Sequence, residues 1–156
     1  GKYVIFHRIF HSIWIDFTNE LSFTEHKWVY GKMLFQARKG NWDSEKVGIG
    51  PPPIKTPKGW LLIYHGISEE DKKYRLGACL LDLDDPSRII SRLDYPILEP
   101  EKDYEETGLR PGTVFSCGAV VIDQTLFVYY GAADQVVAVA SANINKLLQL
   151  LVSKKG

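Results

Sequence analysis

Three apolar segments of this 156-residue chain end in side chains that could carry chemistry. They end in His7-Arg8, in Tyr64-His65-Gly66, and in Tyr129-Tyr130-Gly131-Ala132-Ala133-Asp134. A guanidinium, an imidazole and a carboxylate therefore follow comparable runs of apolar residues. A lone histidine at a strand end is more often a satisfied core or surface residue. Three equivalent ends that all carry polar groups favour a shared binding site at the rim of a sheet.

A stiff stretch precedes the second of these ends. Lys46 is followed by Gly48-x-Gly50 and then by three prolines, Pro51 to Pro53. Glycine permits close backbone approaches that a side chain would block, and proline fixes φ and removes an N–H donor. The sequence therefore predicts a rigid loop that holds Lys46 and the following strand in place. A proline-rich ligand for a recognition domain is the alternative, but no flanking basic spacing supports it.

Two patterns are weak candidates for metal sites. Asp82-x-Asp84-Asp85-Pro86 lacks the further carboxylate and the glycine spacing of a calcium loop, and Asp-Pro is a common turn starter. His7-x3-His11 has helical ligand spacing but lies in strand-like sequence, where positions i and i+4 are about 13 Å apart. We expect no metal site at either place. The motifs of serine hydrolases and of nucleotide phosphate loops do not occur.

The elements that must position these residues form three imperfect repeats. Residues 1–8, 59–66 and 124–131 resemble one another, and each is followed by a second apolar run, at 12–17, 74–81 and 135–140. β-Branched and aromatic residues separated by Gly, Pro and Asp turns are typical of an all-β chain. The run Leu61 to Tyr64 is apolar on both faces, which predicts sheets stacked face to face. A radial arrangement of antiparallel sheets, a β-propeller, provides such burial.

One helix and one long connection complete the predicted elements. A helix is predicted after Ser141 or Asn143, either of which is a good N-cap, and its positively charged end is Ser153-Lys154-Lys155. Its apolar positions follow the i, i+3, i+4, i+7 pattern: Ile144, Leu147, Leu148 and Leu151. The stretch from Asp94 to Pro111 contains prolines and an acidic cluster (Glu99, Glu101, Glu105, Glu106), and we expect a polar connection there.

Length and composition limit the remaining possibilities. A hydrophobic content of 45% supports a packed core, and we expect residues 1–156 to form one domain. Nineteen basic and nineteen acidic residues cancel, so we expect neither a nucleic-acid partner nor an anionic membrane partner. Cys79 and Cys117 lie in apolar strand-like runs, which predicts two reduced core thiols and suits the cytoplasm. The apolar strand that starts at Tyr3 suggests a truncated or split chain.

Several ordered motifs resemble a known family. They are "WDSEKVGIGPPPIKTPKGWLLIYHG", "YRLGACLLDLDDPSRII", "YPILEPEKDYEETG", "VFSCGAVV" and "VYYGAAD". In this order they resemble the C-terminal portion of glycoside hydrolase family 130, whose members are β-mannoside phosphorylases with some hydrolases among them. The resemblance implies a five-bladed β-propeller, of which about three blades' worth and a C-terminal helix are present here.

The resemblance also implies a reaction, the inverting phosphorolysis of a β-mannosyl bond to α-mannose 1-phosphate by a glycosyltransferase-type phosphorylase. The partners would be a β-mannoside oligosaccharide and inorganic phosphate, the latter a co-substrate, with no cofactor. By similarity, Arg8, Lys46 and His65 form the phosphate subsite, which favours phosphate over the water of a hydrolase. Asp134 is similar to the family's carboxylate that holds sugar hydroxyls, and Tyr130 would help to shape that subsite.

The family's general acid and another phosphate-binding arginine belong to segments without a match in this chain. We therefore assign no catalytic residue here, and neither Asp16 nor Asp43 is given that role. The expectation is the C-terminal part of a phosphorylase that is inactive alone. The alternatives are a carbohydrate-binding or self-assembling partial propeller, which would self-associate or pair with the missing N-terminal half, and a β domain that has lost its function. Mannosyl-glucose, mannobiose and mannosyl-N-acetylglucosamine all remain open as substrates.

Overall fold

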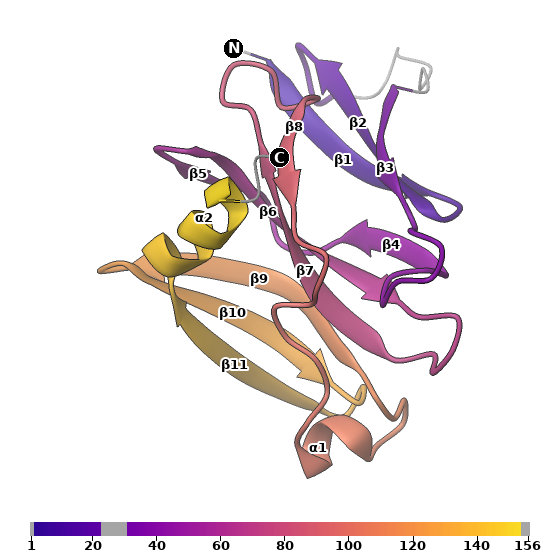
Figure 1. Cartoon of the computed structure of the whole chain (residues 1–156). Coiled ribbons are helices and arrows are strands. Elements are labelled where there is room, and N and C mark those ends of the chain that lie inside the picture. Colours follow the sequence, from indigo (N-terminus) through magenta and orange to yellow (C-terminus); the bar gives the residue numbers. More distant parts are fainter. Residues whose placement is uncertain (1, 23–30, 154–156) are drawn as a thin grey trace.

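The chain folds into three antiparallel sheets that follow one another in sequence order, with one longer helix at the end (Figure 1). This computed structural model describes residues 2–22 and 31–153. The prediction of an all-β chain with a C-terminal helix is confirmed. Each of the three predicted repeats is an antiparallel hairpin that lies in a different sheet.

The first sheet has the order β1-β2-β3. Its strands are β1 (Tyr3–Ile9), β2 (Ser12–Thr18) and β3 (Lys32–Gln36). Phe10 lies in the turn between β1 and β2 with a φ of 52°, a left-handed conformation that suits tight turns. Ile13 and Ile15 alternate with partly exposed residues, so β2 turns one face toward the neighbouring sheet.

The second sheet is the centre of the molecule and has the order β4-β6-β7-β8, with β5 paired to β6. Its strands are β4 (Lys46–Ile49), β5 (Ile54–Thr56), β6 (Gly59–Ile67), β7 (Tyr74–Leu81) and β8 (Ile89–Arg92). Every residue of β6 except Trp60 is buried. The prediction that Leu61 to Tyr64 is apolar on two covered faces is therefore confirmed.

The third sheet has the order β11-β10-β9 and three strands. They are β9 (Val114–Ile122), β10 (Thr125–Ala132) and β11 (Val136–Asn143). β11 lies at the edge of this sheet, and its Val136, Val137 and Val139 side chains are exposed. Among the described residues β11 pairs only with β10, so its outer edge carries unpaired backbone groups, and exposed valine side chains lie on the same strand.

Two hydrophobic cores lie on opposite faces of β6. Leu61 and Ile63 belong to a core shared with the third sheet and the C-terminal helix, whereas Leu62 and Tyr64 belong to a core shared with β2 and β3. Successive side chains of a strand point to opposite faces, so one strand contributes to both cores. The sheets therefore pack face to face, with the central sheet between the other two.

The C-terminal helix, α2 (Ile144–Ser153), begins where it was predicted. Asn143 is its N-cap, since Oδ1 of Asn143 accepts a hydrogen bond from the backbone N–H of Lys146 at 3.1 Å. The four predicted apolar positions are all buried. Lys154 and Lys155, assigned to the end of the helix, lie outside the described residues. Neither described helix is long and apolar enough to cross a membrane.

Two local features differ from the expectations. The polar connection before β9 contains a short helix, α1 (Asp103–Glu106), and Glu105 within it is only 2% exposed. Cys79 is buried as predicted, but Cys117 is exposed, so the prediction of two core thiols is wrong for Cys117. Apolar sequence on both sides of Cys117 did not reveal that β9 leaves one face partly uncovered. Asp85-Pro86 starts a turn as expected, because the carboxylate of Asp85 accepts a hydrogen bond from the N–H of Ser87 at 3.0 Å and its backbone oxygen accepts one from the N–H of Arg88 at 2.9 Å.

Candidate functional site

Two cationic side chains and a histidine, from two sheets, meet where β4 lies beside β6. Arg8 comes from the end of β1, Lys46 begins β4, and His65 lies near the end of β6. The register pairs Gly48 with His65. A methyl group placed on Gly48 would lie 2.3 Å from Nε2 of His65 and 3.3 Å from Cδ of Arg8. The imidazole and the arginine therefore approach the same point of β4, and we call Arg8, Lys46 and His65 the cation cluster.

Gly48 lies within β4, so the prediction of a rigid loop that starts at Lys46 is wrong for residues 46–49, which form a strand. The structure nevertheless explains why position 48 needs glycine. Any larger residue at position 48 would push the imidazole of His65 out of its place. A methyl group on Gly50 would lie 2.8 Å from the backbone oxygen of Ile63. The expectation that these glycines permit close backbone approaches is thus confirmed, and Gly48 makes room specifically for a site residue.

Aromatic rings form one wall of the cation cluster. The His65 ring lies 4.4 Å from the Phe115 ring and 5.8 Å from the Tyr74 ring, measured between ring centroids. Nζ of Lys46 also lies 5.8 Å from the centroid of Tyr74. Phe115 belongs to β9 and Tyr74 begins β7, so residues of all three sheets surround His65. Sequence reasoning missed both rings, and only the position of Tyr74 at the start of a repeat strand could have indicated it.

The electrostatics of His65 reflect this crowding of positive charge. Burial first, and then the charges of Arg8 and Lys46, together lower the pKa of His65 from 6.5 to about 4, against a hydrogen bond with the backbone of Ile49 that raises it. The imidazole is therefore neutral at neutral pH. Its Nδ1 atom is buried and has no hydrogen-bond partner among the described residues. A buried ring nitrogen without a partner is costly unless a ligand satisfies it.

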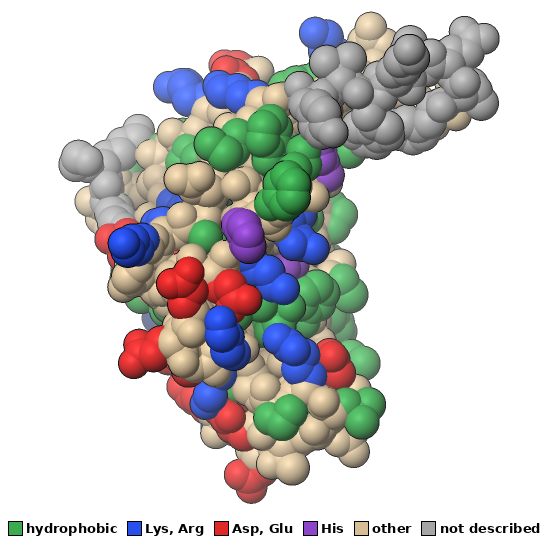
Figure 2. Space-filling model, turned by 90° about the vertical axis from the view of Figure 1, so that its right-hand side faces the viewer, with side chains coloured by type: hydrophobic (Ala, Val, Ile, Leu, Met, Phe, Trp, Pro, Cys, Tyr) green, Lys and Arg blue, Asp and Glu red, His purple; other side chains and the backbone are tan. Residues whose placement is uncertain are grey.

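The positive charge of the cluster is not compensated within the described parts of the chain. None of the described carboxylates forms an ion pair with Arg8, Lys46 or His65. The guanidinium of Arg8 donates one hydrogen bond, to the backbone oxygen of Phe10 at 2.9 Å. Figure 2 shows lysine and arginine side chains beside histidine side chains near the middle of one face of the molecule. Such an arrangement is suited to bind an anion.

The two residues assigned to a sugar subsite lie apart from the cluster. Asp134 is exposed, in the turn after β10, with a left-handed φ of 53°. Tyr130 is 4% exposed, and its hydroxyl donates a hydrogen bond to Oε1 of Glu105 at 2.6 Å. Within the described residues, no hydrogen bond, ion pair or ring contact joins Asp134 or Tyr130 to the cation cluster. The Tyr130 hydroxyl is thus directed to the buried Glu105 and not to the surface.

Glu105 organises the loop that lies beside Asp134. Its Oε2 atom accepts hydrogen bonds from the N–H groups of Glu101 and Lys102 at 2.7 and 2.8 Å. Burial opposes ionisation of this carboxyl, but these hydrogen bonds and that of Tyr130 hold the pKa of Glu105 below its usual value. Its backbone oxygen accepts the N–H groups of Gly112 and Thr113. The buried carboxylate of Glu105 therefore fixes the segment that leads into α1, and its backbone oxygen ties α1 to the residues just before β9.

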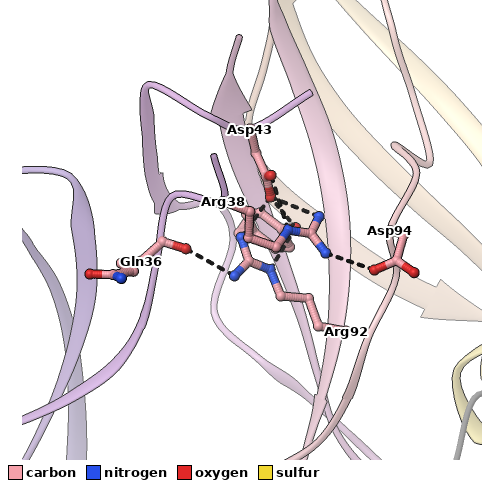
Figure 3. Close-up of polar contacts among 6 residues, drawn as sticks. Gln36, Arg38, Asp43, Arg92 and Asp94 are labelled. Carbon is pink, nitrogen blue, oxygen red and sulfur yellow. Dashed lines mark hydrogen bonds and ion pairs between the residues drawn. The ribbon is translucent and has the colours of Figure 1, made fainter. Parts of the chain in front are cut away.

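A second charged cluster lies on the other side of β6 and was not predicted (Figure 3). The carboxylate of Asp43 is fully buried and accepts hydrogen bonds from Nε and Nη2 of Arg38, at 3.1 and 2.9 Å. It also accepts from Nη2 of Arg92 at 2.6 Å and from the Tyr64 hydroxyl at 3.0 Å. We call Arg38, Asp43, Tyr64 and Arg92 the Asp43 network.

The Asp43 network anchors the loop that leads into Lys46. Arg92 of β8 also donates to the backbone oxygen of Gln36 at 3.0 Å, and so joins the central sheet to the first sheet. Trp42 stacks on Tyr64 with ring centroids 5.7 Å apart. The sequence "WDSEK" places Asp43 three positions before Lys46, but nothing local shows that two distant arginines reach it. The Asp43 network therefore holds the loop before Lys46 against the interior of the protein.

Known proteins resemble this chain along most of its length. The family model of the β-1,4-mannooligosaccharide phosphorylases, glycoside hydrolase family 130, matches residues 1–153. A 1,2-β-oligomannan phosphorylase of Thermoanaerobacter sp. (strain X514) is 50% identical over 140 residues, which are 90% of this chain and 46% of the relative. A β-1,2-mannobiose phosphorylase of the same organism is also 50% identical over 140 residues, covering 90% of this chain and 45% of that protein. The chain thus spans about half the length of these relatives.

A solved structure shares both fold and sequence with this chain. The β-1,2-mannobiose phosphorylase from Listeria innocua, in complex with β-1,2-mannobiose, superposes with a TM-score of 0.88 and 39% identity. The match covers 99% of this chain and 44% of that one. The three sheets accordingly correspond to part of a β-propeller. From the family match along residues 1–153 and this superposition, we conclude that the chain belongs to glycoside hydrolase family 130.

Proposed function

We propose that this chain supplies the phosphate-binding side of the active site of a β-mannoside phosphorylase that acts on β-1,2 linkages. The observation that carries the proposal is that Arg8 and His65 meet at Gly48, with the charge of Lys46 close enough to lower the pKa of His65, and that no described carboxylate pairs with any of the three. The two relatives at 50% identity, an oligomannan and a mannobiose phosphorylase, support the β-1,2 linkage.

In the proposed reaction the cation cluster binds inorganic phosphate and directs one of its oxygens toward the anomeric carbon. That oxygen forms a new bond to the anomeric carbon while the glycosidic bond breaks, and the leaving oxygen takes a proton from a general acid. The products are α-mannose 1-phosphate and the shortened acceptor, with inversion at the anomeric carbon. Arg8 and Lys46 neutralise phosphate charge, and neutral His65 donates an N–H hydrogen bond.

The general acid is proposed to come from outside the 44–46% of the relatives that this chain matches. Asp134 would hold hydroxyl groups of the mannosyl unit, from a turn that the Glu105 loop supports. Without a proton donor the leaving group departs as an alkoxide, which costs about 10²–10⁴-fold in rate. The chain alone is therefore proposed to bind phosphate but to turn over substrate at a negligible rate.

Phosphate binding is the direct test of this proposal. Isothermal titration calorimetry with inorganic phosphate should show one site on the 156-residue chain, and Lys46→Met should weaken binding by about tenfold or more, since hydrogen bonds to charged groups are strong. Lys58→Met is the matched control, because Lys58 is exposed and lies just before β6, at the opposite end of that strand from His65. Equal phosphate affinity in the Lys46 and Lys58 variants would refute the proposed role of the cluster.

A second experiment tests the reaction itself. The chain would be co-expressed with the N-terminal part of the Listeria innocua phosphorylase that has no match here. We expect phosphate-dependent release of α-mannose 1-phosphate from β-1,2-mannobiose by the complex, faster than from β-1,4-mannobiose, and none by the chain alone. Release of mannose independent of phosphate would indicate a hydrolase instead. Turnover by the chain alone would contradict the proposed division of the active site.

The exposed edge of β11 favours association of this chain with another polypeptide segment, which is also part of the proposal. The central sheet has four successive strands, whereas the third sheet ends at β11 with Val136, Val137 and Val139 exposed. We propose that this edge pairs either with the remaining part of the fold seen in the relatives or with a second copy. Light scattering that shows a folded monomer at high concentration, together with no complex in the co-expression, would refute it.

A cytoplasmic location also belongs to this proposal. Cys79 and Cys117 are free thiols, as is usual for proteins of a reducing compartment. Cell fractionation of the native producer would test it, and recovery of the chain outside the cytoplasm would overturn it.

A further inference from the structure

The Tyr74 ring connects the cation cluster to a fourth cation. The guanidinium carbon of Arg110 lies 4.7 Å from the centroid of Tyr74, whose ring also lies 5.8 Å from Nζ of Lys46 and 5.8 Å from the ring of His65. Arg110 is exposed, and its side chain forms no hydrogen bond or ion pair with any of the described residues. Its donors are therefore available to a ligand at the edge of the cluster.

The backbone fixes Arg110 beside the turn that carries Asp134. The N–H of Arg110 donates to the backbone oxygen of Ala133 at 2.9 Å, and the N–H of Ala133 donates to the backbone oxygen of Thr113 at 3.0 Å. A methyl group on Gly108 would lie 2.6 Å from the same oxygen of Ala133. The loop of residues 107–113 and the Asp134 turn are thus in direct contact.

The other end of the same loop is tied to Tyr74. The N–H of Tyr74 donates to the backbone oxygen of Gly112 at 2.9 Å, and Tyr74 forms a parallel bridge with Thr113. Glu105 holds the loop from beneath through the N–H groups of Gly112 and Thr113. The backbone of Arg110 therefore touches the proposed sugar side, while its guanidinium stacks on a ring of the phosphate side. An arginine stacked on a ring keeps its planar donors directed outward.

We propose that Arg110 is an additional anion-binding residue of this site, which binds the phosphoryl group of inorganic phosphate or of a sugar 1-phosphate at the boundary between the phosphate and sugar subsites. This inference rests on the proposed function. Because Arg110 is exposed, its charge is partly screened, and its contribution is smaller than that of Lys46. Removal of the guanidinium should therefore weaken phosphate binding without abolishing it.

The test is a comparison of arginine variants by isothermal titration calorimetry, with inorganic phosphate and with α-mannose 1-phosphate as ligands. We expect Arg110→Gln to weaken both ligands about two- to fivefold, the size of an exposed charge interaction, and Arg110→Lys to recover part of that loss. Arg88→Gln is the matched control, because Arg88 is an exposed arginine that follows β7, at the opposite end of that strand from Tyr74. It should bind both ligands as the original chain does.

Unchanged affinity in Arg110→Gln, while Lys46→Met binds more weakly, would overturn the inference and leave the proposed function standing. Absence of phosphate binding by the original chain would refute the proposed function and the inference with it. A second measurement guards against a folding defect. Addition of phosphate should shift the Nε–H resonance of Arg110 in the unmodified protein, and no shift at saturating phosphate would overturn the inference.

Discussion

Two charged clusters on either side of the same strand differ in how their charges are balanced. In the Asp43 network, Tyr64 of β6 and two arginines surround one buried carboxylate, and Arg38 also pairs with Asp94 at 3.0 Å. The two positive charges there meet two negative ones. In the cation cluster, His65 of the same strand lies between Arg8 and Lys46 with no carboxylate paired to them in the described parts of the chain.

This difference separates a structural role from a binding role. A buried charge that has its full set of partners holds elements together and has little left to offer a ligand. Charges of one sign placed close together destabilise the empty protein, and an anion relieves that cost. The geometry of β6 allows both on one strand, because successive residues such as Tyr64 and His65 point to opposite faces.

The strongest test of the comparison removes the carboxylate of the balanced cluster. Asp43→Ala leaves two arginines and the Tyr64 hydroxyl buried without their partner, so we expect the free energy of unfolding to fall by about 3–5 kcal/mol. Denaturant unfolding followed by circular dichroism measures it. Asp84→Ala, at an exposed turn position, is the control, with an expected change of about 0.5 kcal/mol or less. Equal effects of the two substitutions would show that the network has no structural role.

The next test titrates the unbalanced cluster. The pKa of His65 is about 4 in the folded chain and 6.5 ordinarily, so the unfolded chain binds more protons between these values. The free energy of unfolding should therefore decrease as the pH falls from about 6.5 through 4, by roughly 3 kcal/mol in total. The pH dependence of unfolding in the original chain and in His65→Gln, which should lack this component, measures the effect. An NMR titration that places His65 near 6.5 would contradict it.

Glu105 is a second buried carboxylate with a full set of hydrogen-bond partners, two backbone N–H groups and one hydroxyl. Its removal tests whether such a carboxylate has a structural role. Glu105→Gln removes the charge that accepts hydrogen bonds from Tyr130, Glu101 and Lys102, and should lower the free energy of unfolding by about 2 kcal/mol. The pKa of Glu105 is lowered on folding from 4.5, so its stabilisation is present above that pH and is lost as the pH falls through the folded value. Thermal melting from pH 3 to 7 measures both effects. If Glu105→Gln lost stability toward low pH in the same way as the original chain, Glu105 would not be the source of that pH dependence.

The smallest expected effect is stabilisation of the unbalanced cluster by its ligand. Phosphate at ten times its dissociation constant should raise the free energy of unfolding by about 1.4 kcal/mol, because it binds only the folded chain. The same increase should occur in Arg88→Gln and be largely absent in Lys46→Met at equal phosphate concentration. Melting curves with phosphate and with chloride at matched ionic strength separate binding from screening. An equal increase in both variants would mean that phosphate acts elsewhere.

Much of the fold could be predicted because its signals are local. The alternation in β2, the unbroken apolar run in β6 and the spacing of Ile144, Leu147 and Leu151 each depend on neighbouring residues. The exposure of Cys117 and the burial of Glu105 could not be read in this way. Both depend on which segments cover β9 and α1, and those segments are distant in the sequence.

The residues of the candidate site likewise differ in whether local sequence could predict them. Arg8, Lys46 and His65 could be proposed from the family resemblance of the motifs. The structure brings Arg8 and His65 together at Gly48, and the charge of Lys46 acts on His65. Phe115 and Arg110 could not be proposed in this way, because neither has a distinctive spacing. Tyr74 had only its position at the start of a repeat strand to indicate it. The proximity of these three residues to His65 and Lys46 arises when the start of β7, the start of β9 and the loop before it meet beside β6.

The sequence by itself determined the repeats, the C-terminal helix and the glycines beside the site, because residue type and short-range pattern encode them. The three candidate phosphate ligands came from the resemblance of its motifs to the family. The tertiary structure decided which charges are balanced. Asp43 acquires its arginines from β8 and from the loop after β3, and the neutral His65 acquires two cationic neighbours from β1 and β4. Electrostatic energy depends on distances between segments far apart in the chain, and only the packing of the three sheets sets those distances.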